Sequence, residues 1–189
     1  MPTSSDRIAR AFTAVPRAGF LPAGERRREA YDGPLPIGHG QTNSQPRTVA
    51  DMLRLLDVPV GARVLDVGSG SGWTTALLAH LVGPDGRVDG VEIEPDLVTF
   101  GSANLAATGQ PWASVREAEP GVLGLPAGAP YDRVLVSAEA RELPASLVDQ
   151  LAVGGVLVVP VRGTMLRVVK APGGTTVTRH GSYRFVPLR

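Results

Sequence analysis

The sequence has no cysteine among its 189 residues and no run of 18 consecutive apolar residues. The first absence excludes disulfides and cysteine-ligated metal centres, and it suits a reducing compartment. The second excludes an ordinary transmembrane helix, and the N-terminus also lacks the apolar stretch typical of a signal peptide. We therefore expect a cytoplasmic protein with no metal centre and no membrane partner.

The chain also has almost no net charge. Lysine and arginine total 19, against 18 aspartates and glutamates, which leaves a formal net charge of +1. This balance disfavours a surface dedicated to nucleic acid, so we expect no nucleic-acid partner. Apolar residues make up 43% of the chain, and a chain of this length and composition is expected to form one domain with a substantial core.

The clearest local signal is a glycine-rich stretch that follows a short apolar run. Residues 64–67 read Val-Leu-Asp-Val, as in a buried central strand, and glycines then occupy positions 68, 70 and 72. Residues 73–82 are apolar enough for a buried helix, whose free N–H groups would point back at the glycines. This strand, turn and helix predict a cradle for a ligand that approaches the backbone closely.

The glycine spacing separates two ligand classes that use such cradles. Dinucleotide-binding loops follow the pattern G-x-G-x-x-G, whereas this chain has G-x-G-x-G. With Asp66 before it, the stretch is similar to the first motif of S-adenosylmethionine (SAM) methyltransferases, D/E-x-G-x-G-x-G. Glu92 ends the next apolar run, where both classes place an acid that holds ribose hydroxyls. The pattern favours a SAM methyltransferase over an NAD-dependent oxidoreductase and over a plain α/β loop with a surface glutamate.

Apolar runs alternate with helical patterns through the rest of the chain. We expect strands at 61–67, 88–93, 113–116, 131–138 and 156–161, helices at 5–14, 46–56, 73–82, 95–107 and 143–152, and a hairpin from 166–170 and 175–179. Residues 1–4 are expected to fray, with Ser5 or Asp6 capping the first helix. This alternation predicts an α/β fold, a doubly wound and mostly parallel Rossmann-like sheet with a C-terminal hairpin. The ligand would then lie at the carboxyl ends of the strands, where Gly68 and Glu92 both fall.

Residues 30–46 form a second unusual stretch. They are too rich in proline and glycine for regular structure, and loops of this length in compact domains are usually functional. Six of the seven residues from 39 to 45 have polar side chains, namely His39, Gln41, Thr42, Asn43, Ser44 and Gln45. Pro46 then starts the next helix. Two roles stay open for Ser44: a helix N-cap, or a group that contacts a ligand.

Four segments together resemble the protein-L-isoaspartate (D-aspartate) O-methyltransferase family. Residues 15–22 are similar to the family pattern V-P-R-x-x-F-V-P, residues 30–31 to A-Y, and residues 35–46 to L-P-I-G-x-G-Q-T-I-S-x-P. Residues 184–188, Arg-Phe-Val-Pro-Leu, are similar to the family pattern R-F-V-P-L. The match runs from about residue 11 to residue 188, and the proline-glycine loop is far more specific than the glycine motif.

The resemblance implies a SAM-dependent carboxyl O-methyltransferase that acts on L-isoaspartyl or aspartyl residues of peptides and proteins in repair and releases S-adenosylhomocysteine. It implies a substrate-side segment, residues 1–57, and a SAM-binding core, residues 58–189. The candidate residues are Ser44 and Thr42 for catalysis; Asp66, Gly68, Ser69, Gly70, Gly72, Glu92, Ile93 and Glu119 for the cofactor; and His39, Gln41, Ser137 and Arg184 for the substrate. The accepting carboxylate is already ionised at neutral pH, so no general base is expected.

The chain departs from the family pattern at three positions. Pro120 stands where the family has the aspartate of a G-D-G motif, so Glu119, or Glu117, would have to reach the adenine instead. Glu139 places a carboxylate near the expected rim of the site, where it would repel a substrate carboxylate if it pointed inward. Asn43 replaces a common isoleucine. These departures keep two alternatives open: methylation of one specific aspartate in a partner peptide, and a module that binds SAM with little turnover.

Overall fold

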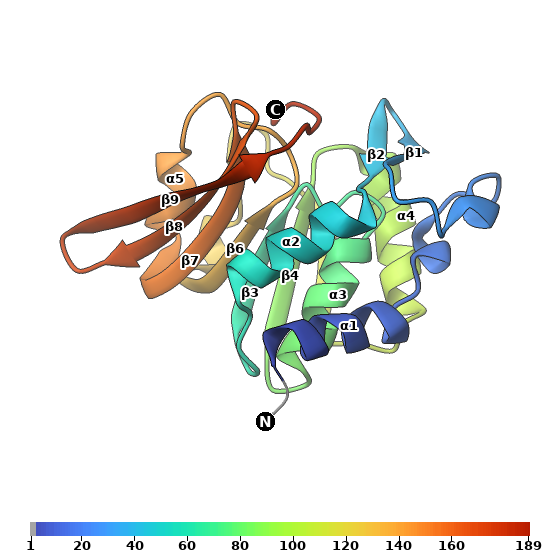
Figure 1. Cartoon of the computed structure of the whole chain (residues 1–189), viewed down its shortest axis with the longest axis horizontal. Coiled ribbons are helices and arrows are strands. Elements are labelled where there is room, and N and C mark those ends of the chain that lie inside the picture. Colours follow the sequence, from blue (N-terminus) through green and yellow to red (C-terminus); the bar gives the residue numbers. More distant parts are fainter. Residues whose placement is uncertain (1–2) are drawn as a thin grey trace.

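A seven-stranded sheet forms the centre of the molecule in the computed structural model, which describes residues 3–189 (Figure 1). The strand order is β5-β4-β3-β6-β7-β8-β9. The bounds are β3 (Arg63–Val67), β4 (Arg87–Glu92), β5 (Ala113–Glu117), β6 (Tyr131–Val136), β7 (Leu151–Val161), β8 (Thr164–Ala171) and β9 (Gly174–Ser182). Strands β3 to β7 pair in parallel, and β8 and β9 add an antiparallel hairpin. The predicted α/β fold with a C-terminal hairpin is therefore confirmed.

Five α-helices and three short 3-10 helices accompany the sheet within residues 3–189. They are α1 (Ser4–Ala14), α2 (Pro46–Leu56), α3 (Trp73–Val82), α4 (Pro95–Ala106) and α5 (Ala145–Asp149), with η1 (Arg17–Phe20), η2 (Arg26–Arg28) and η3 (Pro126–Gly128). Helices α1, α2 and α3 lie together on one side of the sheet (Figure 1), where they share a core with Val64 of β3. Leu65 and Val67 of the same strand belong to a second core on the other face, because side chains alternate along a strand. None of these helices is long and apolar enough to span a bilayer.

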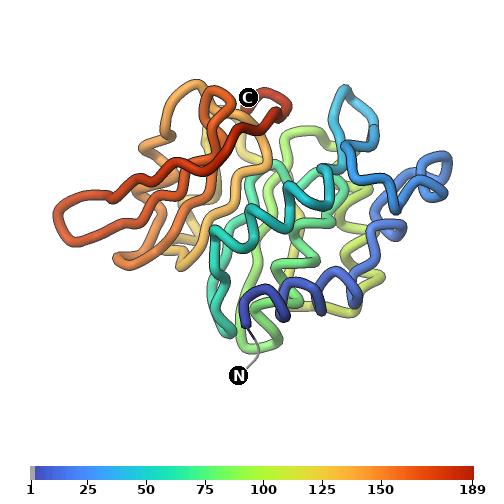
Figure 2. The backbone as a smooth tube through the Cα atoms, in the orientation of Figure 1, coloured from blue at the N-terminus to red at the C-terminus, as the bar shows by residue number. Residues whose placement is uncertain are grey.

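The order of the strands places a crevice beside β3. The chain runs from β3 outward to β4 and β5, and it then crosses to β6 on the other side of β3. Such a reversal opens a ligand-binding crevice at the carboxyl ends of the strands. The backbone trace in Figure 2 shows that the β1–β2 hairpin and the C-terminal end of the chain both lie at one edge of the molecule, away from the N-terminus.

The segment 30–46 is more regular than its composition predicts. It contains an antiparallel hairpin of β1 (Leu35–Gly38) and β2 (Gln41–Asn43). Leu35 and Ile37 are buried and alternate with exposed Pro36 and Gly38, so the period-two signal is present but only four residues long. The expectation of an irregular loop is wrong because this short alternation outweighs the proline and glycine content.

Two other predicted elements differ from the structure. Helix α5 covers only residues 145–149 of the predicted 143–152, because Leu151 already pairs with Tyr131 at the start of β7. The first helix is capped by Thr3, whose hydroxyl accepts from the N–H of Asp6 in a capping box. Thr3 and Ser4 are therefore ordered, and residues 1–2 of the predicted frayed end lie outside the described residues.

Candidate functional site

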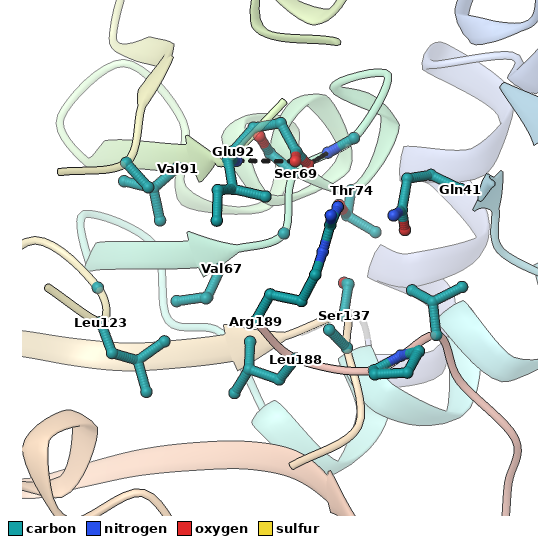
Figure 3. A pocket seen from close by; sticks show the side chains of 18 of the residues that line it. Gln41, Val67, Ser69, Thr74, Val91, Glu92, Leu123, Ser137, Leu188 and Arg189 are labelled. Atoms are coloured by element: carbon teal, nitrogen blue, oxygen red, sulfur yellow. Dashed lines mark hydrogen bonds between the residues drawn. The ribbon is translucent and has the colours of Figure 1, made fainter. Parts of the chain in front are cut away.

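A pocket of about 450 Å³ lies at the carboxyl ends of β3, β4 and β6 (Figure 3). Its wall is formed by the β1–β2 hairpin, the glycine loop after β3, the end of β4, residues 118–124, residues 137–138 and residues 186–189. The pocket therefore joins segments from both ends of the sequence at the crevice that the strand order creates.

The three glycines of the loop have different roles. All three have positive φ angles, of 76° at Gly68, 52° at Gly70 and 85° at Gly72, a region that glycine enters without steric cost. Gly68 and Gly70 line the pocket. Gly72 is instead the N-cap of α3, and a Cβ there would lie 2.8 Å from the carbonyl oxygen of Gly101 in α4. Gly72 therefore allows close packing of α3 against α4, and its predicted cofactor role stays a prediction.

Glu92 ends β4 and accepts three backbone hydrogen bonds while lining the pocket. Its Oε2 accepts from the N–H of Gly70 at 2.8 Å, and its Oε1 accepts from those of Ile93 at 2.8 Å and Glu94 at 3.1 Å. A carboxylate offers about four acceptor positions, so one remains, on Oε2. Glu92 therefore fixes the glycine loop and has capacity for one ligand hydroxyl. Ile93 lines the pocket beside it.

Asp66, which the sequence predicts as a cofactor residue, does not itself line the pocket. Its side chain is fully buried, and its Oδ2 accepts from the hydroxyls of Thr74 and Thr75, each at 2.7 Å. Burial raises the pKa of Asp66 to about 6, although these two hydrogen bonds act to lower it and Glu92 adds to the rise. Asp66 thus supports the first turn of α3 from beneath the glycine loop.

The remaining cofactor-side wall is apolar with a few polar groups. Val67, Val91, Leu123 and Leu188 line it (Figure 3). The hydroxyls of Ser69 and Ser137 are buried there and have no hydrogen-bond partner within residues 3–189. Buried polar atoms of this kind usually have a partner, so these two hydroxyls suit a bound ligand. An apolar wall beside unpartnered hydroxyls and a carboxylate fits a nucleoside.

The segment that carries the Pro120 departure also reaches the pocket. Glu119 and Pro120 both line it, whereas Glu117 lies exposed on β5 and does not. Of the two glutamates considered as replacements for the missing aspartate, Glu119 is therefore the one in position.

On the substrate side, the hairpin presents Gln41, Thr42 and Ser44 to the pocket. The N-cap of α2 is Gln45, whose own side chain makes no capping bond, and the N–H of Arg47 in the first turn donates instead to Asp32 Oδ1 at 3.0 Å. Within the described chain, the Ser44 hydroxyl makes no hydrogen bond. The backbone carbonyl of Ser44 accepts one from the Arg17 guanidinium at 2.9 Å. The alternative in which Ser44 is a helix cap is therefore wrong.

Two predicted substrate residues lie outside the pocket. His39 occupies the turn of the hairpin, where its ring nitrogens lie 3.1 Å from Asp96 Oδ2 and 3.8 Å from Glu94 Oε2. Arg184 is exposed on the segment after β9 and does not line the pocket. Whether His39 and Arg184 face the pocket depends on how distant segments fold, which a local motif cannot specify.

Arg189 lines the pocket although no sequence signal points to it. Its guanidinium pairs with Glu94, and its side chain reaches across the pocket between Glu92 and Gln41 (Figure 3). The neighbouring segment is held by Glu139, whose backbone N–H donates to Val186 and whose carbonyl accepts from Leu188. A terminal arginine is brought here only by these tertiary contacts.

Glu139 itself points away from the pocket. Its Oε2 accepts from the N–H of Gly163 at 3.0 Å, and the residue does not line the pocket. It therefore does not place a repelling carboxylate in the site. Among residues 3–189, no group of three histidine, aspartate or glutamate side chains is placed to bind a metal ion.

The reversed strand order, the glycine loop after β3 and the carboxylate at the end of β4 define the SAM-methyltransferase fold. Comparison with known proteins identifies the family within this class of methyltransferases. The family model for protein-L-isoaspartate(D-aspartate) O-methyltransferase (PCMT) matches residues 2–189, and the chain belongs to this family.

Individual relatives agree with the family model. The protein-L-isoaspartate O-methyltransferase of Methanopyrus kandleri is 46% identical over 189 residues, which cover 97% of this chain and 84% of the relative. That of Aeropyrum pernix is 44% identical over 190 residues, covering 98% of this chain and 73% of the relative. A crystal structure of the Plasmodium falciparum enzyme in complex with S-adenosyl-L-homocysteine superposes with a TM-score of 0.86 at 28% identity, covering 97% of this chain and 90% of that one.

Proposed function

We propose that this protein is a SAM-dependent carboxyl O-methyltransferase that methylates L-isoaspartyl residues of peptides and proteins in repair. The observation that carries the proposal is the meeting of two motifs in one pocket. The hairpin presents Thr42 and Ser44 to the same pocket as Gly68, Gly70 and Glu92. A methyl acceptor and a methyl donor can therefore lie side by side. Family membership and the relative with S-adenosyl-L-homocysteine bound support the cofactor.

On the cofactor side, the free acceptor position of Glu92 would take one ribose hydroxyl. The hydroxyls of Ser69 and Ser137 offer further hydrogen bonds, and Val67, Val91 and Leu123 would cover the base. SAM supplies an electrophilic sulfonium methyl group when it is bound. The apolar side chains around it would exclude water, which would favour a step in which charge is neutralised.

On the substrate side, Ser44 and Thr42 would orient the accepting carboxylate. The Ser44 hydroxyl has no partner within the described residues, so it is free to donate one hydrogen bond to a carboxylate oxygen. The carboxylate is ionised at neutral pH and needs no general base. Catalysis then rests on holding the two reacting groups in line, which can contribute several kcal/mol. The hairpin belongs to residues 1–57, which supports the division into a substrate-side segment and a SAM-binding core.

No observation favours the two alternatives. Methylation of one specific aspartate was suggested by Glu139 and by the altered adenine loop, but Glu139 binds Gly163 rather than facing the pocket. A binding module without turnover was suggested by Pro120, but Glu119 lines the pocket next to it. The cytoplasmic location and the absence of a nucleic-acid or membrane partner stay predictions.

A methyl-transfer assay tests the proposal. Transfer from SAM is measured with an isoaspartyl peptide and with the same peptide containing normal aspartate. We expect transfer to the isoaspartyl peptide and far less to its aspartyl counterpart. Binding of S-adenosylhomocysteine without transfer to either peptide would support the binding module instead. Transfer to the aspartyl peptide alone would support a specific-aspartate enzyme.

A further inference from the structure

A buried arginine organises the substrate hairpin. Arg17 is 5% exposed, and its guanidinium donates to the carbonyl oxygens of Tyr31, Gly33, Asn43 and Ser44 at 2.8–2.9 Å. These acceptors come from the segment before the hairpin, from the end of its second strand and from the residue that follows that strand. The carbonyl group next to the Ser44 side chain is thus fixed by a charge-assisted hydrogen bond.

The side chain of Asn43 extends this network into the cofactor loop. Its Oδ1 accepts from Arg17 Nε at 2.7 Å, and its Nδ2 donates to Ser71 Oγ at 3.0 Å. Asn43 is 4% exposed and Ser71 is 2% exposed. The carbonyl of Ser71 in turn accepts from Asn104 Nδ2 of α4 at 3.0 Å. One buried chain of hydrogen bonds therefore runs from η1 through the hairpin to the glycine loop and α4.

The two ends of the Asn43–Ser71 contact lie next to the groups that face the ligands. Asn43 immediately precedes Ser44, and Ser71 immediately follows Gly70, whose N–H binds Glu92. A buried polar group that loses its partner is costly. The glycine loop and the hairpin therefore cannot move apart without leaving an unpaired amide and hydroxyl between them.

We propose that Asn43 is a positioning residue that couples cofactor binding to peptide binding through Ser71. The inference rests on the proposed function. A cofactor that orders the glycine loop holds Ser71, Ser71 holds Asn43, and Asn43 holds the backbone beside Ser44. Coupling of this kind is reciprocal, so the peptide strengthens cofactor binding by the same factor. Asn43 stands where the family pattern has isoleucine. An isoleucine side chain can neither accept a hydrogen bond from Arg17 nor donate one to Ser71.

The test measures coupling rather than affinity alone. The dissociation constant of S-adenosylhomocysteine is determined by calorimetry with and without a saturating isoaspartyl peptide, for the wild type and for Ser71→Ala, Asn43→Leu and Ser102→Ala. Ser102→Ala is the matched control because its hydroxyl donates to Val115 in the α4–β5 packing and does not line the pocket. The coupling factor is the ratio of the dissociation constants measured without and with the peptide. Losing a direct contact between Ser71 and the cofactor changes both dissociation constants equally, so it leaves this ratio unchanged.

We expect the peptide to strengthen cofactor binding at least fivefold in the wild type and in Ser102→Ala. In Ser71→Ala and Asn43→Leu this factor should fall at least threefold, toward one, as expected when one hydrogen bond of the coupling path is lost. Ser71→Ala leaves the Arg17–Asn43 contact intact, so it decides the question if Asn43→Leu fails to fold. A wild-type coupling factor that both variants retain, or the lack of any coupling in the wild type, would overturn the inference. Failure of the wild type to bind the peptide at all would instead overturn the proposed function, and the coupling with it.

Discussion

Replacing Glu92 by glutamine separates the two tasks of this carboxylate. Glutamine keeps the shape but has one acceptor oxygen in place of two. In the wild type, Oε1 accepts from two N–H groups, of Ile93 and Glu94, and Oε2 accepts from that of Gly70. The amide NH2 group is therefore best placed at the Oε2 position, where it opposes one donor rather than two. That orientation removes both the hydrogen bond to the glycine loop and the acceptor left for a ribose hydroxyl.

The magnitude follows from these two losses. A hydrogen bond to a charged group contributes about 1.5–3 kcal/mol. The lost ribose contact should weaken S-adenosylhomocysteine binding about 10- to 150-fold. The lost contact with Gly70 should lower the free energy of unfolding by a similar 1.5–3 kcal/mol, since that bond is present without a ligand.

Calorimetric titration and urea unfolding of Glu92→Gln measure these two effects. Glu117→Gln is the matched control, because Glu117 pairs in register with Glu92 on the adjacent strand but is exposed and outside the pocket. We expect the control to stay within about twofold of the wild type in affinity. If Glu92→Gln binds S-adenosylhomocysteine as tightly as the control does, the assignment of Glu92 to the ribose is refuted.

Three further predictions concern Ser44, Glu119 and Asp66. Ser44→Ala should lower kcat and kcat/KM together by tenfold or more and change the free energy of unfolding by under about 0.5 kcal/mol, since this hydroxyl caps no helix; normal kinetics would exclude the role. Glu119→Ala should weaken S-adenosylhomocysteine binding about three- to tenfold by calorimetry, and unchanged affinity would exclude the adenine contact. Because the pKa of Asp66 is raised to about 6 from 3.8, its contribution to stability is greatest below pH 4 and falls by up to about 3 kcal/mol as the pH rises to 6. Urea unfolding of Asp66→Asn should lack that slope, so a difference from the wild type that stays constant between pH 4 and pH 6 would contradict the burial effect.

The regular elements were predictable where burial produces a long periodic pattern. Helix α2 buries Val49, Met52, Leu53 and Leu56 on one face, and both of its ends match the sequence prediction. The short hairpin and the start of β7 were not predictable, because each depends on pairing with a partner elsewhere in the chain. Leu151, for example, reads as the end of a helix until Tyr131 is placed beside it.

The candidate site was predictable to the extent that local motifs contain it. Gly68, Gly70 and Glu92 follow from strand, turn and acid in order, and Ser44 follows from the resemblance. The same motif also contains residues that support the loop without facing the pocket, as Asp66 does beneath α3. A motif records which residues are needed together, and only the fold separates those that face a ligand from those that hold the loop in place.

The two most specific motifs of the sequence turn out to form one structural unit. The β1–β2 hairpin has three paired positions, and one of them is Pro36, which has no N–H to donate. Such a two-stranded hairpin is only marginally stable by itself. Arg17, from the motif at residues 15–22, supplies it with buried and half-buried hydrogen bonds to the backbone of Tyr31, Gly33, Asn43 and Ser44. The positive charge of the Arg17 guanidinium needs no carboxylate in contact, because several carbonyl dipoles surround it. Burial nevertheless lowers the pKa of Arg17 to about 10. The arginine and the loop therefore depend on each other, and the position of Ser44 depends on both.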